Sequence, residues 1–500
     1  MKIGEGSILN EYERQRLENI RRNEEILRQL NIPELSRSPS QPTRQSLRLR
    51  GFTPDGADAK REAEKVEKRR EREKRVRLMG DLDLNTVRSD MTSIDDTNYF
   101  VDLLSKMKRF SDDESTISDD IDYSSIAGGA DGFKTAQRAY RSLAIRTQWA
   151  SVKVTPERIY SIAVHPAKEK VLAAAGDRDG WLGFWDVNET VKSEDDDYED
   201  QPRTYMFQAH SAPISSTMYS PTDSNHLYTC SYDGSIRFFD FNQAKFMEAF
   251  IYSGTKEPEC QLSSMDMDPN GQIIYFSTNG GKFGIKDIRE PVEKFTEYEL
   301  HEHKIGCISI NKVLPHYLIT ASLDRSMRLW DIRKLNSESS IEIQKIRTNN
   351  AITSAYWSPN GNQVAISCFD DTVKVYDFDK ETYLRQRFQT PHNNRTGRWV
   401  TMFRAIWNPN QNVHPHYIIG DMQRSAEIFS GVKGELIWTL RDDRLTAIPA
   451  VNAFHPNLNL IISGNASGRM NAWEENAGSS LSERFKSMPQ PIVVINGNHL

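Results

Sequence analysis

The feature of this sequence that most restricts its fold is an internal repeat, with a period of about 40 to 50 residues, that begins at Arg158. Each unit has an apolar strand, a turn with Pro or Gly, a second apolar strand, a turn of small residues and a third strand. Seven such units cover residues 158–186, 214–240, 262–287, 305–331, 352–377, 402–430 and 451–475. This period is typical of propellers and solenoids, in which each repeat is one supersecondary unit that stacks on its neighbours.

The third strand of six units ends in an aromatic residue, and the six are Trp185, Phe239, Trp330, Tyr376, Phe429 and Trp473. Lys286 replaces the aromatic residue in the third unit. In four units an aspartate lies six residues earlier, where it can accept hydrogen bonds from the turn, and these are Asp179, Asp233, Asp324 and Asp370. We predict that His210 and His303, which precede units two and four, bond the aspartates of their units rather than a metal ion.

Seven such sheets in one chain raise the question of how their edge strands are protected. A four-stranded sheet has exposed edges, and radial closure around a channel leaves only short, protected ones. The sequence therefore predicts an all-β fold, a seven-bladed β-propeller over residues 136–478, followed by a C-terminal tail over 479–500. We expect residues 138–153 to supply the strand that completes the last blade.

The region before the repeats is charged and poor in Trp. We predict that residues 1–135 form a largely disordered arm with short helical segments, including an amphipathic helix within 11–30. The segment KRREREKRVR has two interpretations, a solvated helix with ion pairs between its turns or a segment for nuclear import and nucleic-acid contact. Residues 111–122 indicate an acidic linker, in which Ser111 resembles a site for an acidophilic kinase.

Composition argues against several classes of function. The four cysteines lie in four different repeats without a C-x-x-C pair, so we expect reduced core residues and neither a zinc site nor a disulfide framework. A long apolar run and a secretory signal are both lacking, so a membrane partner is not expected. Motifs for nucleophilic, phosphate-binding, zinc-protease or dinucleotide sites are also lacking, and we expect no catalysis, cofactor, metal or small-molecule substrate.

The segment PHNNRTGRWVTMFRAIWNP, before and within unit six, combines basic and aromatic side chains. Arg395, Arg398 and Arg404 flank Trp399. An exposed aromatic ring can stack on bases or wedge between them, while arginines neutralise phosphates. The alternative is that Trp399 packs between blades and the arginines are solvated.

Two further cations extend this candidate DNA site. Arg158 and Lys304 occupy equivalent positions at the first strands of units one and four, so both are expected at the same end of the propeller. A basic ring at that end would bind double-stranded DNA and also single strands.

A second candidate site is the pair of D-I-R endings on consecutive units. Asp287 and Arg289 end unit three, and Trp330, Asp331 and Arg333 end unit four. The two arginines would form a docking patch for a protein partner, and the alternative is that these residues are ordinary structure at the edge of a blade.

These residues resemble the family of WD-repeat DNA damage-binding proteins, which includes the fungal changed-mutation-rate protein and is related to the small subunit of the UV-damaged-DNA-binding complex. The resemblance covers the whole propeller. It is most specific in ITASLDRSMRLWDIR and PHNNRTGRWVTMFRAIWNP, and RQSLRLRG in the arm is also similar.

The resemblance implies a seven-bladed WD-repeat β-propeller that binds damaged, UV-irradiated DNA. It implies that Gly397, Arg398 and Trp399 correspond to a hairpin that enters the duplex, although the wedge residues differ from those of the related subunit. Arg158 and Arg404 match its DNA contacts.

The resemblance also implies a protein partner. Trp330, Asp331 and Arg333 match a W-D-x-R ending that docks on the adaptor of a cullin-RING ubiquitin ligase, and Asp287 and Arg289 are a copy that lacks the aromatic residue. We therefore expect a DNA-binding protein of the nucleus, and also of the cytoplasm. The alternative is a scaffold that binds chromatin proteins or serves as a ligase substrate receptor.

Overall fold

The computed structural model of the 500-residue chain describes residues 76–112, 130–146, 148–191, 200–252, 258–336, 340–379 and 383–475, together with residues 18, 21 and 22. The chain divides into two compact units, Met1–Glu73 and Lys74–Leu500. The segment RQSLRLRG and the tail over 479–500 lie outside the described residues, as do most of the helix predicted within 11–30, most of KRREREKRVR and most of the acidic linker. The described strands all belong to the second unit.

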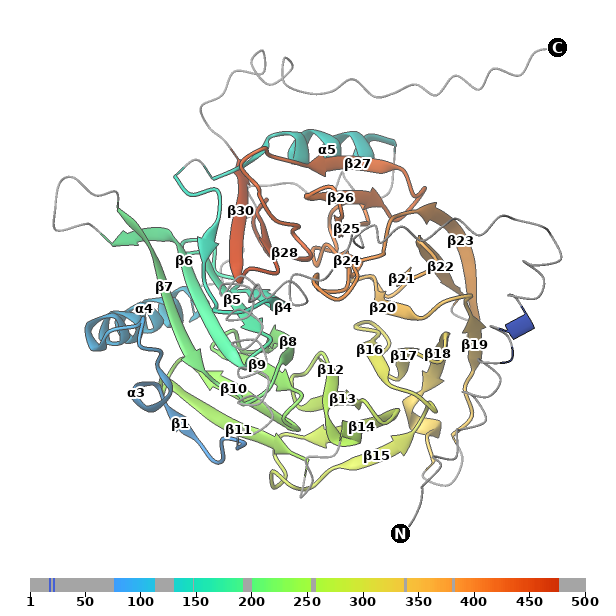
Figure 1. Ribbon diagram of the computed structural model, residues 1–500, viewed down its shortest axis with the longest axis horizontal. Helices are drawn as coiled ribbons and strands as arrows, with labels where there is room; N and C mark the ends of the chain where they lie inside the picture. Colours follow the sequence, from blue (N-terminus) through green and yellow to red (C-terminus); the bar gives the residue numbers. More distant parts are fainter. Residues whose placement is uncertain are drawn as a thin grey trace, which may run out of the picture. The chain divides into compact units, whose positions relative to one another are not determined.

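Seven antiparallel sheets surround a central channel and form the blades of a propeller, as predicted (Figure 1). Blade 1 contains β4 (Ile159–Val164), β5 (Leu172–Asp177), β6 (Trp181–Val191) and β7 (Gln201–Gln208). Blade 2 contains β8 (Ile214–Tyr219), β9 (His226–Ser231), β10 (Ser235–Asp240) and β11 (Lys245–Ile251). Blade 3 contains β12 (Leu262–Met267), β13 (Ile273–Thr278), β14 (Lys282–Asp287) and β15 (Thr296–Glu299), after the short 3-10 helix Pro258–Cys260.

The remaining blades repeat this order. Blade 4 contains β16 (Ile305–Ile310), β17 (Tyr317–Ser322), β18 (Ser326–Asp331) and β19 (Gln344–Arg347). Blade 5 contains β20 (Ile352–Trp357), β21 (Gln363–Cys368), β22 (Thr372–Asp379) and β23 (Tyr383–Pro391). Blade 6 contains β24 (Ile406–Trp407), β25 (His416–Asp421), β26 (Ser425–Ser430) and β27 (Leu436–Leu440), and blade 7 contains β28 (Val451–Phe454), β29 (Ile461–Gly464) and β30 (Arg469–Glu475).

Blade 7 is completed by residues from the N-terminal side of the propeller. β2 (Leu143–Ile145) pairs with β30 from Leu143 opposite Glu475, and β3 (Val152–Lys153) pairs with β30 from Val152 opposite Met470. The prediction that residues 138–153 close the ring is confirmed. The preceding helix α5 (Ala130–Arg141) packs on blade 6, where the Tyr140 hydroxyl bonds His416 Nε2 at 2.5 Å.

The innermost strands of neighbouring blades run in the same direction. Ser264 and Asp266 of β12 accept hydrogen bonds from the backbone N–H groups of Ile308 (3.2 Å) and Ile310 (2.7 Å) of β16, so the two strands advance together. One hydrogen bond recurs at three places between neighbouring segments of the ring. The hydroxyls of Ser215, Ser263 and Thr353, each the second residue of an innermost strand, donate to the carbonyls of Leu262, Ile305 and Phe403 of the following segment.

The propeller therefore has two distinct faces. We call the face where the innermost strands begin the leading face, and the face where they end the trailing face. The turn between the second and third strands also lies on the leading face, because the backbone N–H groups of Arg178, Leu323 and Phe369 donate to the carbonyls of Arg158, Lys304 and Ala351 (3.0 Å each).

Histidine–aspartate pairs fix the turns of two blades. His210 Nδ1 bonds Asp233 at 3.1 Å, as predicted, but Asp324 is bonded by His301 Nδ1 at 2.8 Å and not by His303. His301 is buried and His303 is exposed, and both observed pairs are 23 residues apart in the sequence. His301 Nε2 further bonds Thr320, which also accepts from the indole N–H of Trp330 (2.9 Å).

The turn of blade 1 differs from the prediction for Asp179. Asp177 accepts from the backbone N–H groups of Asp179 (2.8 Å) and Trp181 (2.9 Å). Asp177 occupies the strand-end position at which blade 2 has Ser231, which accepts from the backbone N–H of Asp233. A carboxylate with two acceptor oxygens at this position takes over the role predicted for Asp179.

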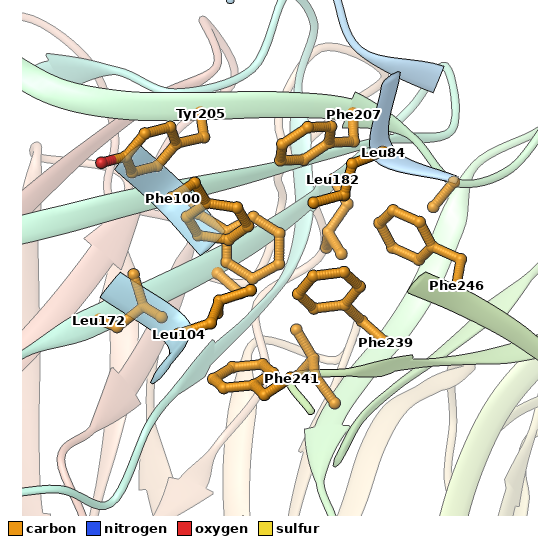
Figure 2. Packing of buried hydrophobic residues seen from close by; sticks show 14 of the residues in the cluster. Leu84, Phe100, Leu104, Leu172, Leu182, Tyr205, Phe207, Phe239, Phe241 and Phe246 are labelled. Atoms are coloured by element: carbon orange, nitrogen blue, oxygen red, sulfur yellow. The ribbon is translucent and has the colours of Figure 1, made fainter. Parts of the chain in front are cut away.

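Residues before the propeller are more ordered than predicted. β1 (Leu82–Asp83) pairs with β11, and α3 (Leu84–Val87) and α4 (Ile94–Asp112) follow it. Phe100, which is fully buried, packs against Tyr205, Phe207 and Phe239 of blades 1 and 2 (Figure 2) and also against Phe184 of blade 1. The prediction that the disordered arm extends to residue 135 is therefore wrong for residues 80–107, which are structured and pack on the propeller.

A buried arginine secures the start of this segment. Arg237 of β10 is fully buried and donates to the carbonyls of Leu78 (2.7 Å) and Gly80 (2.6 Å), while Glu248 lies 3.3 Å from it. A buried guanidinium must be paired or hydrogen-bonded. The carbonyls of Leu78 and Gly80 supply hydrogen bonds to Arg237 that blade 2 alone would not provide.

The cysteines agree with the prediction of reduced core residues. All four are free thiols, and Cys230, Cys307 and Cys368 are buried. Burial raises the pKa of the Cys230 thiol to about 12, so this group is neutral. Among the described helices, none combines the length and the apolar character that crossing a bilayer requires.

Candidate nucleic-acid interface

The loop over residues 392–405, which connects β23 with β24, begins on blade 5. Its first residues are fixed by the turn between β21 and β22, where the backbone N–H of His392 donates to the carbonyl of Asp371 (2.9 Å). The side-chain amide of Asn394 donates to the carbonyls of Cys368 (2.8 Å) and Thr372 (3.0 Å). The loop therefore starts from a rigid position on the leading face.

The other part of the loop reaches blade 1. Thr401 Oγ1 donates to the carbonyl of Ile159 (2.6 Å), and Arg158 Nη1 donates to the carbonyl of Arg398 (2.8 Å). Blades 6 and 7 lie between blades 5 and 1 around the ring (Figure 1). The loop therefore crosses the propeller beside the channel on the leading face, and both of its ends are held.

Trp399 stands at the exposed part of this loop. Its side chain is 76% exposed, so the alternative that it packs between blades is excluded. Arg398 beside it is also exposed, and Gly397, which precedes Arg398, has a positive φ of 61° with nothing within 4 Å of the position of a Cβ atom. A large ring that is held by an anchored loop and covered by nothing in the described protein is available to a partner.

The two predicted cations at the first strands lie on the leading face, as expected from their equivalent positions. Arg158 lies 5.0 Å from the centroid of the Tyr160 ring and donates to its hydroxyl (2.8 Å). Lys304 lies 4.7 Å from the centroid of the Tyr232 ring and donates to its hydroxyl (2.5 Å). Each tyrosine orients its cation without neutralising it. Sequence reasoning missed these two tyrosines.

The other two arginines of the predicted site have different surroundings. Arg395 is exposed, and its Nε lies 2.8 Å from a carboxylate oxygen of Asp371. Arg404 is not on the surface beside Trp399, because its side chain lines the central channel. Its Nε has no hydrogen-bond partner within the described part of the protein. The structure thus brings Arg158, Arg398 and Trp399 together and places Arg404 deeper.

The channel itself has a volume of about 440 Å³ and is lined by the innermost strands of all seven blades. Lys312 beside blade 4 and Asp266 of the neighbouring blade 3 form an ion pair in its wall at 2.6 Å. Since that lysine is neutralised, Arg404 carries the uncompensated positive charge of the channel wall, and it adds to the positive potential at the leading face.

The D-I-R endings lie on the trailing face. Arg289 binds Asp287 through Nε (2.9 Å) and Nη2 (2.5 Å), and Arg333 binds Asp331 in the same way (2.9 and 2.8 Å). The arginine side chains are 63% and 64% exposed. The hydrogen bond from Arg289 lowers the pKa of the Asp287 carboxyl to about 2.

Trp330 does not belong to a contact surface. Its side chain is 1% exposed and packs inside blade 4, so it supports Asp331 and Arg333 from below. Asp331 is buried as well, and its carboxylate also accepts from the backbone N–H of Arg333 at the start of the 3-10 helix Ile332–Lys334. The predicted docking patch is thereby reduced to the two exposed arginines and the partly buried Asp287.

The buried histidines act as structural hydrogen-bonding groups. Among the described residues, no group of three His, Cys, Asp or Glu side chains lies close enough together to hold a metal ion. Burial lowers the pKa of His416 to about 4 and that of His455 to about 4, which keeps both rings neutral.

Seven blades of four or five strands, histidine–aspartate pairs at the turns of two of them and a buried tryptophan near a strand end define a WD-repeat propeller. The model of the WD domain, G-beta repeat, matches residues 201–240, 293–331 and 341–377. The chain belongs to the family of the fungal DNA damage-binding protein CMR1, as its resemblance at the sequence level indicated.

Three relatives that carry this name illustrate the match. The chain is 32% identical to the protein of Neurospora crassa, with 93% of this chain and 98% of the relative covered. It is 31% identical to the protein of Phaeosphaeria nodorum, with 95% and 100% covered, and 33% identical to that of Emericella nidulans, with 93% and 99% covered. The similarity therefore extends over nearly the full length of this chain and of each relative.

Proposed function

We propose that this protein binds DNA through the leading face of its propeller and prefers damaged, UV-irradiated duplexes. The observation that carries the proposal is the anchored loop that presents Trp399 to solvent next to the cations Arg158 and Arg398. The relatives named DNA damage-binding protein support the same activity.

The geometry suits recognition of a weakened base step. Because the loop is fixed at blades 5 and 1, little conformational entropy is lost when Trp399 enters a duplex. Inserting a ring requires unstacking of bases, and a lesion lowers that cost, so a wedge favours damaged over intact sites. Single strands, whose bases are already accessible, would bind through the same ring.

The cations supply affinity that does not depend on sequence. Arg158, Lys304 and Arg398 are positioned for phosphates, with Arg395 at the rim and Arg404 contributing from the channel. This role is binding rather than catalysis, and we expect it to be exercised in the nucleus.

A second surface supports a second role. The exposed guanidiniums of Arg289 and Arg333 are held in the same way on neighbouring blades of the trailing face. We propose that this pair docks a protein partner, such as the adaptor of a cullin-RING ligase or a chromatin protein, while the leading face holds DNA.

The first experiment is a titration of the full chain with intact and UV-irradiated duplexes, for the parent protein and for Trp399→Ala. Stacking contributes about 1 to 3 kcal/mol per base, so Trp399→Ala should weaken binding by roughly tenfold with an almost unchanged salt dependence. It should also reduce the ratio of the affinity for irradiated duplex to the affinity for intact duplex.

Tyr383→Ala is the matched control. Tyr383 is another exposed aromatic residue, but it begins β23 opposite Asp379, on the trailing face. Its loss should leave DNA binding unchanged. If the parent binds intact and irradiated duplex equally, the proposed preference is wrong, and if Trp399→Ala binds like the parent, the ring is no wedge.

A further inference from the structure

The residue directly before the third strand has a positive φ in all seven blades. Four blades have glycine there, namely Gly180, Gly234, Gly281 and Gly468, with φ between 72° and 88°. The other three, which are consecutive around the ring, have Arg325 (66°), Asp371 (59°) and Arg424 (64°). This position lies on the leading face.

Steric contact explains some of the glycines. A Cβ atom at Gly180, Gly281 or Gly468 would lie 2.1, 2.1 or 2.0 Å from a carbonyl oxygen of a neighbouring segment, so no larger residue fits. At Gly234 the nearest atom would be 3.5 Å away, and glycine is kept there although a side chain would fit. Conformation alone therefore favours glycine, because a left-handed φ is strained for residues with a Cβ.

Asp371 offsets this strain through contacts inside the protein. Aspartate tolerates the left-handed region better than most residues. Its carboxylate lies 2.8 Å from Arg395 and accepts from the backbone N–H of Asn394 (3.2 Å), and both residues belong to the loop that carries Trp399. The side chain thus anchors the loop.

Arg325 and Arg424 have no such compensation. Both side chains are exposed, and neither forms an ion pair or a side-chain hydrogen bond with any described residue. The carboxylates nearest in sequence are engaged elsewhere. Asp324 accepts from His301, Ser326 and Arg328, and Asp421 accepts from Gln423 (2.9 Å) and Ser425 (3.2 Å).

Three exposed arginines away from the leading face behave differently. Arg289, Arg333 and Arg387 are each bound to an aspartate. A strained position that carries a free cation points to a ligand outside the molecule. Blade 4 has two more cations close to this turn. The backbone carbonyl of Lys304 accepts a hydrogen bond from the backbone N–H of Leu323 in the turn, and the exposed Arg347 of β19 lies opposite Ser326.

We propose that Arg325 and Arg424 are two further phosphate-contacting residues, which extend the DNA-binding surface over the turns of blades 4 and 6, on either side of the anchored loop. This inference rests on the proposed function and enlarges its site. The duplex then contacts the leading face at blade 1, at the loop and at blades 4 and 6.

Substitution by glycine separates binding from folding. Arg325→Gly with Arg424→Gly removes both cations while relieving the left-handed strain, so the melting temperature of the full chain should stay equal or rise. Binding to a duplex of about 30 base pairs should weaken at least fivefold, and the slope of log K against log salt should shrink by roughly 1.8 for two lost phosphate contacts. Arg325→Lys with Arg424→Lys should keep most of the slope.

The control is Arg289→Gly with Arg333→Gly, which removes two charges from the trailing face and should leave DNA binding unchanged. If the parent binds DNA and the glycine variant at positions 325 and 424 has the parent's affinity and slope, the inference is wrong and the proposed function stands. If the parent itself shows no binding to DNA, the proposed function is wrong and this extension falls with it.

Discussion

Arg158 connects the charge of the leading face with its geometry. Its guanidinium contacts the Tyr160 ring, bonds the Tyr160 hydroxyl and donates to the carbonyl of Arg398. A lysine would keep the charge, but a single ammonium would not reproduce the planar, multiple donation that joins blade 1 to the loop. The same side chain therefore holds the loop that positions Trp399 and contributes to the positive potential around it.

Residues close in sequence can differ in depth, and this limits what the sequence predicts about the site. Arg398 and Arg404 are six positions apart, yet one is exposed on the loop and the other lines the channel. The sequence identified both as basic residues near Trp399, but the path of the loop depends on bonds to Asp371 and Ile159, which are distant in the chain. No local pattern contains that information.

Glu427 gives the stability of blade 6 a pH dependence. Burial, together with the nearby charge of Asp421, raises the pKa of this carboxyl from 4.5 to about 7. The folded protein therefore keeps a proton that the unfolded chain releases above about pH 4.5, so this contribution to stability is present at low pH and is lost as pH rises toward 7.

We expect Glu427→Gln to remove that part of the pH dependence. The amide is neutral at every pH, and the variant should gain melting temperature relative to the parent as pH rises from 5 to 8. Melting curves across this range, with Glu435→Gln on the same blade as a control, provide the measurement. A constant difference between Glu427→Gln and the parent at all pH values would contradict the raised pKa.

At the scale of elements, the ends of β14 and β18 carry the proposed docking patch. Each terminal aspartate fixes an arginine two residues later, so the two guanidiniums project from adjacent blades in the same orientation. The turn is well formed in both blades, although Lys286 replaces the tryptophan in blade 3 and donates to the carbonyls of Glu290 and Pro291.

Arg333→Ala should abolish capture of a cullin-ligase adaptor, and Arg289→Ala should weaken it less, because the buried Trp330 supports Asp331 and Arg333 from below and blade 3 has Lys286 in its place. Neither change should affect the fold, since both side chains are mostly exposed and surface substitutions usually alter stability by about 0.5 kcal/mol or less. Pull-down of purified adaptor with each variant is the measurement. Unchanged capture by the double variant would leave the endings as structural turns only.

The sequence predicted strands better than it predicted the elements that cover them. The seven repeats and the terminal aromatic positions follow from a periodicity that is repeated many times, and the closing strand follows from the need to complete the last sheet. α4 occurs once, and its apolar residues Phe100, Leu103, Leu104 and Met107 follow helical spacing within a stretch rich in charge. A single short pattern competes with an acidic background, so its burial becomes evident only from the cluster of blade 1 and blade 2 residues against which it packs.

At the scale of the whole molecule, the two proposed binding surfaces lie at opposite ends of the third strands. Arg325 directly precedes β18 on the leading face, and Arg333 follows its end on the trailing face. A strand of six residues spans roughly 17 to 20 Å, so the two surfaces are separate. One propeller can therefore hold DNA at one end and a protein at the other without overlap.

The order of the N-terminal segments gives the whole-molecule prediction, in which the chain is shortened stepwise. Removal of residues 1–73 deletes the first compact unit and should leave the melting temperature of the second unchanged. Removal of residues 1–112 also deletes β1, α3 and α4. It uncovers the aromatic cluster of blades 1 and 2 and leaves buried Arg237 without two of its acceptors.

Loss of Phe100 alone should cost about 3 to 5 kcal/mol, so the protein lacking residues 1–112 should melt well below the other, yet remain a closed propeller. Removal of residues 1–157 further deletes β2 and β3, which leaves β30 as an unpaired edge and should give an insoluble protein. Thermal unfolding and solubility of the three proteins test this order. Equal melting temperatures for the proteins lacking residues 1–73 and 1–112 would show that α4 adds nothing to stability. A soluble protein of unchanged stability after removal of residues 1–157 would show that blade 7 does not need β2 and β3.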